Sequence, residues 1–337
     1  MASQTTSQAV ARLLERQPHQ PWSGDGSQQK KLLVVNPDGD FLTDLSDTAW
    51  CFHAGHAAYW QQPYCQAKAP DLTNFFGVLF IVAKEQALNQ YVLEQLSELD
   101  ADTPVWLAGE KRGGIAALVK KLPAFFAPPV KLASGNHCQL FQTTITESRP
   151  APALADFIHS VPINLTNQQF SVRSLPGVFS KGRLDPATEL LLEILPPHLP
   201  DPILDFACGN GVIAATIERR QQAQLSLCDV NPMAIQAAQL NLAAADNQFF
   251  CSDGIPPSLP PQACIISNPP FHTGLKTDYQ VARRFIVDAH DKLIRGGQLY
   301  LVANNFLPWP EVIIATFGHC HTLASNNKFS VYQAQKS

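Results

Sequence analysis

The segment Asn268-Pro269-Pro270-Phe271, directly after the apolar run Ile265 to Ser267, could bind and orient a planar amino group. Such an amine is a poor nucleophile because its lone pair is delocalised into the ring. The side-chain oxygen of Asn268 and the carbonyl of Pro269 could accept its two N–H bonds and favour the pyramidal form. The prolines fix the turn without adding an N–H group, and Phe271 could stack on a flipped base. The four residues therefore form a predicted catalytic turn that would direct the lone pair of an amine at a donor methyl group, with an ordinary Asn-Pro turn after a strand as the alternative.

A second group of residues could hold the methyl donor. The predicted strand Ile203 to Ala207 runs into a glycine loop and a helix, where backbone N–H groups can approach a ligand closely. Asp229 ends the next predicted strand, 24 residues after Asp205, where a carboxylate can accept both hydroxyls of a ribose. Asp253 follows the strand after that, where it could meet the adenine amino group or simply cap the turn before Gly254.

Either a dinucleotide or S-adenosylmethionine would fit this loop. The acidic Asp205 before the glycines favours S-adenosylmethionine, as does Ala214, which stands where a third dinucleotide-binding glycine would be. The predicted donor-binding residues are Asp205, Ala207, Cys208, Gly209, Asn210, Gly211, Asp229, Val230, Asp253 and Asn268.

Aromatic and basic side chains near these motifs could contact RNA. The predicted contacts are Phe179, Lys181, Arg183, Lys276, Arg283 and Arg284. Arg283 and Arg284 could equally form the solvated face of a helix. No metal site is predicted, because the nearest candidates match no zinc spacing; they are Cys51, His53, His56 and Cys65.

The elements that position these motifs alternate between strand and helix in the C-terminal half. Asp185 caps a helix that starts at Pro186. Strands are predicted at Ile203 to Ala207, Leu225 to Val230, Gln248 to Ser252, Ala263 to Ser267, Gln298 to Ala303, Cys320 to Ala324 and Lys328 to Ala334. Helices are predicted at Gly211 to Arg220, Pro232 to Ala244 and Tyr279 to Leu293. This pattern predicts an α/β fold, a doubly wound sheet of about seven strands whose last pair forms an antiparallel edge.

The N-terminal half repeats this pattern. The eleven residues Leu132 to Gln142 share five identities with Leu323 to Gln333, at an offset of 191. Other strands correspond at offsets of 194 and 185, so we expect one fold used twice, by duplication. At the offset of 185, Ala83 to Gln86 takes the place of Asn268 to Phe271, so the N-terminal copy has lost the acceptors.

The segment Thr143 to Gln169 lacks clear helical or strand signals and is predicted to be the linker. The expected domains are therefore residues 1–160, a degenerate methyltransferase-like domain that positions RNA, and residues 161–337, the catalytic domain.

Composition and charge limit the possible partners. The 337 residues have a net charge of -4, so no overall positive field would draw the chain to nucleic acid, and local patches must do so. No apolar run is long enough to span a bilayer, and the first ten residues lack the pattern of an export signal. We therefore expect a cytoplasmic protein without membrane contact.

The motifs together resemble a known family. The Asp205 to Gly211 loop, Asp229, Asp253 and Asn268 to Phe271 look like those of class I S-adenosylmethionine-dependent N-methyltransferases. The flanking segments Ser174 to Ser180, Leu184-Asp185, Phe271 to Gly274 and Ala303 to Pro308 resemble the ribosomal RNA small subunit methyltransferase C family. The resemblance implies methylation of a guanine N2 amino group in 16S rRNA of the 30S subunit, by a chain that is expected to be a monomer.

One departure and two alternatives accompany this resemblance. The family's loop usually carries glycine where this chain has Ala207, which should narrow the loop slightly. An N-methyltransferase acting on adenine or on a protein glutamine would use a similar turn. A catalytically idle ribosome-assembly factor that only binds RNA is the alternative outside the enzymes.

Overall fold

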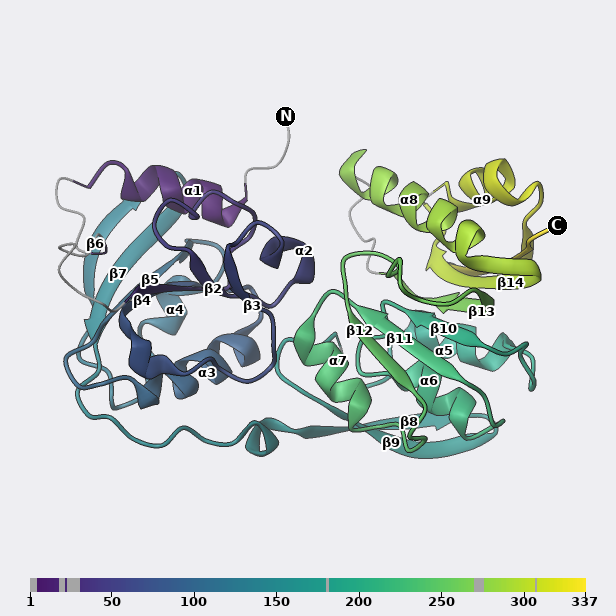
Figure 1. Ribbon diagram of the computed structural model, residues 1–337, viewed down its shortest axis with the longest axis horizontal. Coiled ribbons are helices and arrows are strands. Elements are labelled where there is room, and N and C mark those ends of the chain that lie inside the picture. The colour runs from purple at the N-terminus through teal and green to yellow at the C-terminus, as the bar shows by residue number, and fades with distance from the viewer. Residues whose placement is uncertain (1–4, 18–21, 23–30, 180–181, 270–275, 307) are drawn as a thin grey trace. The chain divides into compact units, whose positions relative to one another are not determined.

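The computed structural model describes residues 5–17, 22, 31–179, 182–269, 276–306 and 308–337, and for 276–282 the backbone alone. The chain divides into two compact units, Met1–Phe157 and Ile158–Ser337. Each is built on a seven-stranded, mostly parallel sheet (Figure 1). The predicted α/β class, with two tandem doubly wound sheets, is confirmed.

The N-terminal unit has the strand order β3-β2-β1-β4-β5-β7-β6. Its strands are β1 (Lys31–Val35), β2 (Thr48–Trp50), β3 (Gln62–Tyr64), β4 (Phe75–Ile81), β5 (Pro104–Glu110), β6 (Val130–Gly135) and β7 (Cys138–Thr144). Its α-helices are α1 (Thr6–Leu14), α2 (Ala54–Ala57), α3 (Gln86–Gln95) and α4 (Ile115–Leu118). Its 3-10 helices are η1 (Leu72–Asn74), η2 (Leu96–Glu98) and η3 (Leu154–Phe157).

The C-terminal unit has the corresponding order β12-β11-β10-β13-β14-β16-β15, with a separate hairpin of β8 and β9. Its strands are β8 (His159–Leu165), β9 (Gln168–Ser174), β10 (Ile203–Phe206), β11 (Leu225–Asp229), β12 (Gln248–Cys251), β13 (Gln262–Ser267), β14 (Leu293–Asn304), β15 (His321–Ser325) and β16 (Phe329–Gln335). Its helices are α5 (Pro186–Ile194), α6 (Val212–Glu218), α7 (Pro232–Gln239), α8 (Lys276–Lys292) and α9 (Trp309–Phe317). The predicted antiparallel edge is confirmed, since β16 runs antiparallel to β14 and β15.

The C-terminal sheet is covered on both faces, which explains its apolar strands. In β10, Ile203 packs into one hydrophobic cluster and Leu204 into another. Ile266 and Ile265 divide in the same way in β13. Because successive side chains of a strand point to opposite faces, a sheet buried on both faces needs apolar residues at consecutive positions. Asp205 is thus a carboxylate at a position where the fold alone would favour a hydrocarbon.

The two sheets share details beyond strand order. Leu107 lies opposite Phe141 between β5 and β7, and Leu301 lies opposite Tyr332 between β14 and β16, which matches the predicted offsets of 194 and 191. An extra residue interrupts the pairing of each closing hairpin at the same place, at Leu132 and Leu323. The internal repeat is therefore present in the backbone as well as in the sequence.

Strand register corrects one part of the repeat. Leu79 lies opposite Trp106, and Ile266 lies opposite Tyr300, its counterpart at the offset of 194. The offset between β4 and β13 is therefore 187, so the predicted 185 was wrong by two residues. The position of Asn268 is filled by Ile81 and not by Ala83, because apolar strands of similar composition align almost equally well after a shift of two.

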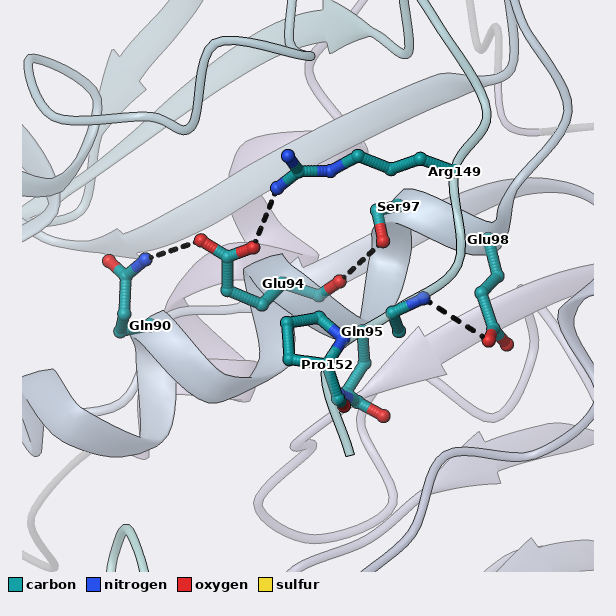
Figure 2. A network of polar contacts seen from close by, with 8 residues as sticks. Gln90, Glu94, Gln95, Ser97, Glu98, Arg149 and Pro152 are labelled. Atoms are coloured by element: carbon teal, nitrogen blue, oxygen red, sulfur yellow. Dashed lines mark hydrogen bonds and ion pairs between the residues drawn. The ribbon is translucent and has the colours of Figure 1, made fainter. Parts of the chain in front are cut away.

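The predicted linker is mostly ordered structure. Its first part is attached to the N-terminal unit: Arg149 forms an ion pair with Glu94 of α3 at 2.9 Å, and the amide of Gln95 donates to the Pro152 carbonyl at 2.9 Å (Figure 2). Its second part is β8 and the start of β9. Val161, Ile163 and Leu165 alternate with exposed residues, which is itself a strand pattern. The prediction was wrong there because it weighed only the polar residues and the proline between them.

Sequence reasoning also missed α9, which begins at Trp309 and carries the run Val312, Ile313 and Ile314. β-Branched residues favour strands in isolation, but here Val312 and Ile313 pack in one cluster with residues of α8, while Ile314 is exposed. Among the described residues, no helix combines the length and the apolar character needed to cross a membrane.

Candidate functional site

The predicted donor-binding residues meet at one edge of the C-terminal sheet. Strands β10, β11, β12 and β13 run parallel, so the residues that follow them lie at the same edge. Asp205 and the glycine loop end β10, Asp229 ends β11, Asp253 follows β12 and Asn268 follows β13. Open α/β sheets bind their ligands at this edge.

Asp205 lies beneath the loop and is only 1% exposed. Its Oδ2 accepts from the backbone N–H of Ala214 in the first turn of α6, at 3.2 Å. Its Oδ1 is buried and has no hydrogen-bond partner among the described residues. Burial raises the pKa of the Asp205 carboxyl to about 8. A positively charged ligand bound at the loop, such as one with an ammonium group, would favour the ionised form of this buried carboxyl.

Asp229 holds two loops together. Its Oδ2 accepts from the N–H of Gly209 at 2.9 Å, and its Oδ1 accepts from the N–H of Asn231 at 2.9 Å. Burial raises the pKa of Asp229, and the backbone hydrogen bonds oppose this shift. The Asn231 side chain in turn donates to the Gly177 carbonyl at 2.9 Å. The carboxylate predicted to bind a ribose therefore also fixes the loop around it.

The loop backbone requires small residues. Gly209 has φ +55°, and a Cβ there would meet no atom within 4 Å, so open space lies in front of it. At Gly211, with φ +76°, a Cβ would come within 3.0 Å of the Ala238 side chain on α7. Ala207 adopts φ +57°, in the left-handed region that favours glycine. Ala207 therefore strains the backbone, and the open space before Gly209 leaves room for a ligand.

Other predicted donor-binding residues support this loop. The N–H of Cys208 donates to the Cys228 carbonyl at 3.1 Å, and the buried Asn210 accepts from Asn241 through its own carbonyl at 2.9 Å. Val230 is half-buried, and Asp253 is exposed beyond β12. No contact of Asp253 tells the predicted adenine role from a role in the turn.

Asn268 is held in one orientation by α5. Its Nδ2 donates to Asp185 Oδ2 at 3.0 Å and to Thr188 Oγ1 at 2.8 Å. Asp185 is also the predicted cap of α5, where Oδ2 accepts from the N–H groups of Ala187 and Thr188. Both N–H bonds of the Asn268 amide are therefore engaged, which leaves its oxygen to accept from another group.

A cavity of about 250 Å³ adjoins this amide. It is lined by Asp185, Ala187, Asn268, Pro269, Ala303, Asn304, Trp309 and Phe329. Trp309 is buried and belongs to α9, the helix that sequence reasoning missed. The cavity thus combines aromatic side chains with hydrogen-bonding groups next to the predicted catalytic asparagine.

The residues that were predicted to contact RNA do not form one cluster among the described residues. Phe179 is 57% exposed, and Arg183 and Arg283 are exposed. Arg284 lies 3.5 Å from Asp288 on its own helix, which agrees with the alternative of a solvated helix face. Lys276 begins α8, but its side chain is outside the described part of the chain. Pro270, Phe271 and Lys181 lie outside the described residues.

Three functional positions escaped prediction or were given a smaller role. Asp185 was recognised only as a helix cap, and Thr188 and Asn231 were not singled out. Asn231 carried a signal, since Asn before Pro232 is typical of a helix start. The contact from Thr188 to Asn268 spans 80 residues of sequence and left no local signal.

In the described ranges, no three His, Cys, Asp or Glu side chains gather as metal ligands would.

Both halves of the chain match known families. Residues 169–333 match the Methyltransferase small domain, and residues 25–161 match the Methyltransferase small domain N-terminal family. The Ribosomal RNA small subunit methyltransferase C of Idiomarina loihiensis is 46% identical over 97% of this chain and 99% of that protein. The protein of the same name from Pseudomonas aeruginosa strain UCBPP-PA14 is 38% identical over 91% of this chain and 94% of its own length.

Among solved structures, the chain resembles a T. thermophilus 16S rRNA N2 methyltransferase in complex with AdoMet and guanosine. The TM-score is 0.79 at 23% identity, over 97% of this chain and 92% of that one. At this identity, the likeness establishes a common fold.

Proposed function

This chain belongs to the ribosomal RNA small subunit methyltransferase C family, and on that premise we propose that it methylates the N2 amino group of a guanine in 16S rRNA. The methyl donor is S-adenosylmethionine. The observation that carries the proposal is the fixed Asn268 amide, whose oxygen is free to accept at the sheet edge that also holds the glycine loop. The T. thermophilus protein of the same fold was solved with AdoMet and guanosine, which supports this choice of donor and base.

We assign the donor side to the loop after β10 and to the ends of β11 and β12. Asp205 would face the donor's ammonium group, and Asp229 its ribose hydroxyls. Gly209 leaves space for the ligand, and Asp253 would lie at the adenine edge. Bound there, S-adenosylmethionine supplies an electrophilic methyl group on a positively charged sulfur.

The acceptor side follows from Asn268. Its oxygen and the Pro269 carbonyl would accept the two N–H bonds of the guanine amine, which frees the nitrogen lone pair for the methyl carbon. We place the base against the cavity beside Asn268, with Trp309 and Phe329 in its lining. The methylated amine then loses a proton to water, so no strong base is required.

We further propose that the N-terminal unit positions the RNA and supports the catalytic unit. Register places Val34 opposite Leu79, where the C-terminal unit has Asp205 opposite Ile266. A fragment of residues 158–337 should therefore bind and methylate RNA less well than the full chain. Equal binding and methylation would contradict this role.

The substrate class implies the remaining assignments. We propose a cytoplasmic monomer that acts on the assembled 30S subunit. Gel filtration checks the monomer, and comparison of naked 16S rRNA with purified 30S subunits checks the substrate.

The activity itself is tested by incubation of the purified chain with labelled S-adenosylmethionine and 30S subunits, followed by nucleoside analysis. The expected product is N2-methylguanosine. A methylated adenosine or a methylated glutamine would favour the alternative enzyme, and RNA binding without methyl transfer would favour the assembly factor.

A further inference from the structure

Resting on this proposed function, we infer that Asp185 and Thr188 are positioning residues that keep the oxygen of Asn268 turned toward the substrate amine. Both belong to the first turn of α5 and its cap, and Asn268 follows β13. The three side chains are joined by the 3.0 Å and 2.8 Å contacts of Asn268 Nδ2. Thr188 is buried, so water competes weakly for its hydroxyl.

The chemistry of the partners determines which end of the amide faces α5. A carboxylate only accepts hydrogen bonds, so Asp185 Oδ2 can face the NH₂ end of Asn268 and not its oxygen. The Thr188 hydroxyl lies 3.5 Å from the same Asp185 oxygen, to which it can donate. Its lone pairs are then directed to the Asn268 NH₂ group. The Asn268 oxygen consequently points away from α5.

Orientation matters because an asparagine side chain turned by 180° presents donors instead of an acceptor. A turned amide would place its N–H bonds against those of the guanine amine, and the amine would keep its planar form. Two acceptors on the NH₂ side oppose this rotation. The donor loop after β10 is not part of this contact, so S-adenosylmethionine binding should be independent of it.

The N-terminal unit offers a contrast. Ile81 occupies the position of Asn268 and has no amide to orient. The first turn of α1 is held instead by Asp38, whose Oδ2 accepts from the Thr6 N–H at 2.8 Å. The first turn of α1 is thus held by a side chain that follows β1, whereas the cap of α5 contacts a side chain that follows β13.

The test uses Thr188, because it touches Asn268 without lining the cavity. In the full chain, Thr188→Val should lower kcat on 30S subunits by about ten-fold, the order of one lost hydrogen bond. The KM values for RNA and for S-adenosylmethionine should stay unchanged. Thr188→Ser keeps the hydroxyl and should retain activity within about two-fold of the unchanged chain.

A matched control separates positioning from folding. Thr316→Val removes a helix-internal hydrogen bond of similar length, from Thr316 Oγ1 to the Val312 carbonyl at 3.1 Å, and should leave kcat unchanged. In an Asn268→Ala background, Thr188→Val should have no further effect on single-turnover rates. An equal loss in both backgrounds, or loss of kcat in Thr188→Ser as severe as in Thr188→Val, would overturn the inference.

The unchanged chain distinguishes the two proposals. If it produces no N2-methylguanosine, the proposed function fails. If it does, and Thr188→Val retains full kcat, then the proposed function stands and the positioning role is wrong.

Discussion

The two units have the same strand order and the same interruption in the closing hairpin, yet at the described positions the polar residues proposed for the methyl-transfer site are found in the C-terminal unit alone. Where the C-terminal unit has Asp205 and Asn268, the register gives Val34 and Ile81 in the N-terminal unit. Cys51 stands at the place of Asp229, because Trp50 pairs with Val35 as Cys228 pairs with Phe206. The apolar replacements preserve the sheet, so this fold does not require polar residues at these positions.

Asp205 shows that a buried carboxyl at the proposed site is unfavourable for the stability of the fold. A valine at this position buries hydrocarbon without penalty, whereas burial raises the pKa of the aspartate to about 8. The left-handed backbone at the end of the first central strand is retained in both units, by Asn36 and Ala207, each with φ +57°. The two units therefore share the backbone conformation of this turn although the side chains around it differ.

The largest expected difference follows from Asn268→Ile, which installs the residue found in the N-terminal unit. Methyl transfer should fall by about 100- to 1,000-fold, the range for removal of one preorganised polar group. Single-turnover kinetics measure the rate, and calorimetry should show S-adenosylmethionine affinity nearly unchanged. A rate within ten-fold of the original would show that the two units do not differ in the proposed way.

Asp229→Cys should weaken S-adenosylmethionine binding by about 100-fold, since two backbone N–H groups and the ribose lose their acceptor. Titration calorimetry measures the dissociation constant. The reverse exchange, Cys51→Asp, should create no second site, because Val34 and Ile81 remain. A stoichiometry of two would contradict the assignment of a single donor site.

A smaller difference between the units is expected in the pH dependence of their stability. Since the folded pKa of Asp205 is raised from 3.8 to about 8, its neutral form is favoured by folding, and that stability is lost progressively as pH rises from about 4 to about 8. The transition temperature of the C-terminal unit should therefore fall between about pH 4 and 8 and level off above that range. Asp205→Asn should reduce this slope, and an unchanged slope would assign it to other groups.

The smallest predicted effect concerns the two left-handed residues. Ala207→Gly should raise the unfolding free energy by up to about 1 kcal/mol, because glycine removes the strain at positive φ. Asn36→Gly should lower it, since asparagine tolerates this conformation and its Nδ2 donates to the Ile81 carbonyl at 2.9 Å. Thermal unfolding measures both, and changes of the same sign would contradict this distinction.

The sequence predicted the catalytic sheet well because its signals are local. Apolar runs marked the central strands, and Asp185-Pro186 marked the start of α5. Two features were missed. The hairpin β8 and β9 has a local strand pattern of alternating buried residues, interrupted by a proline in β8. The branched residues of α9 resemble a strand, and their helical form depends on tertiary packing.

The site was predictable in composition but not in its internal contacts. Asp205, Asp229 and Asn268 were found because each ends a strand at the same edge. The orientation of Asn268 depends on Asp185 and Thr188, more than 79 residues earlier in the chain, and a single sequence gives no measure of such a contact.

The extra residue at Leu132 and at Leu323 bears on the history of the chain. Deleting it would move every later side chain of its strand to the opposite face, so gradual substitution cannot erase it. A slip of one residue in a ladder is therefore difficult to lose by substitution alone. In proteins whose two halves have lost detectable sequence similarity, such an irregularity could still show that both halves descend from one ancestral gene segment.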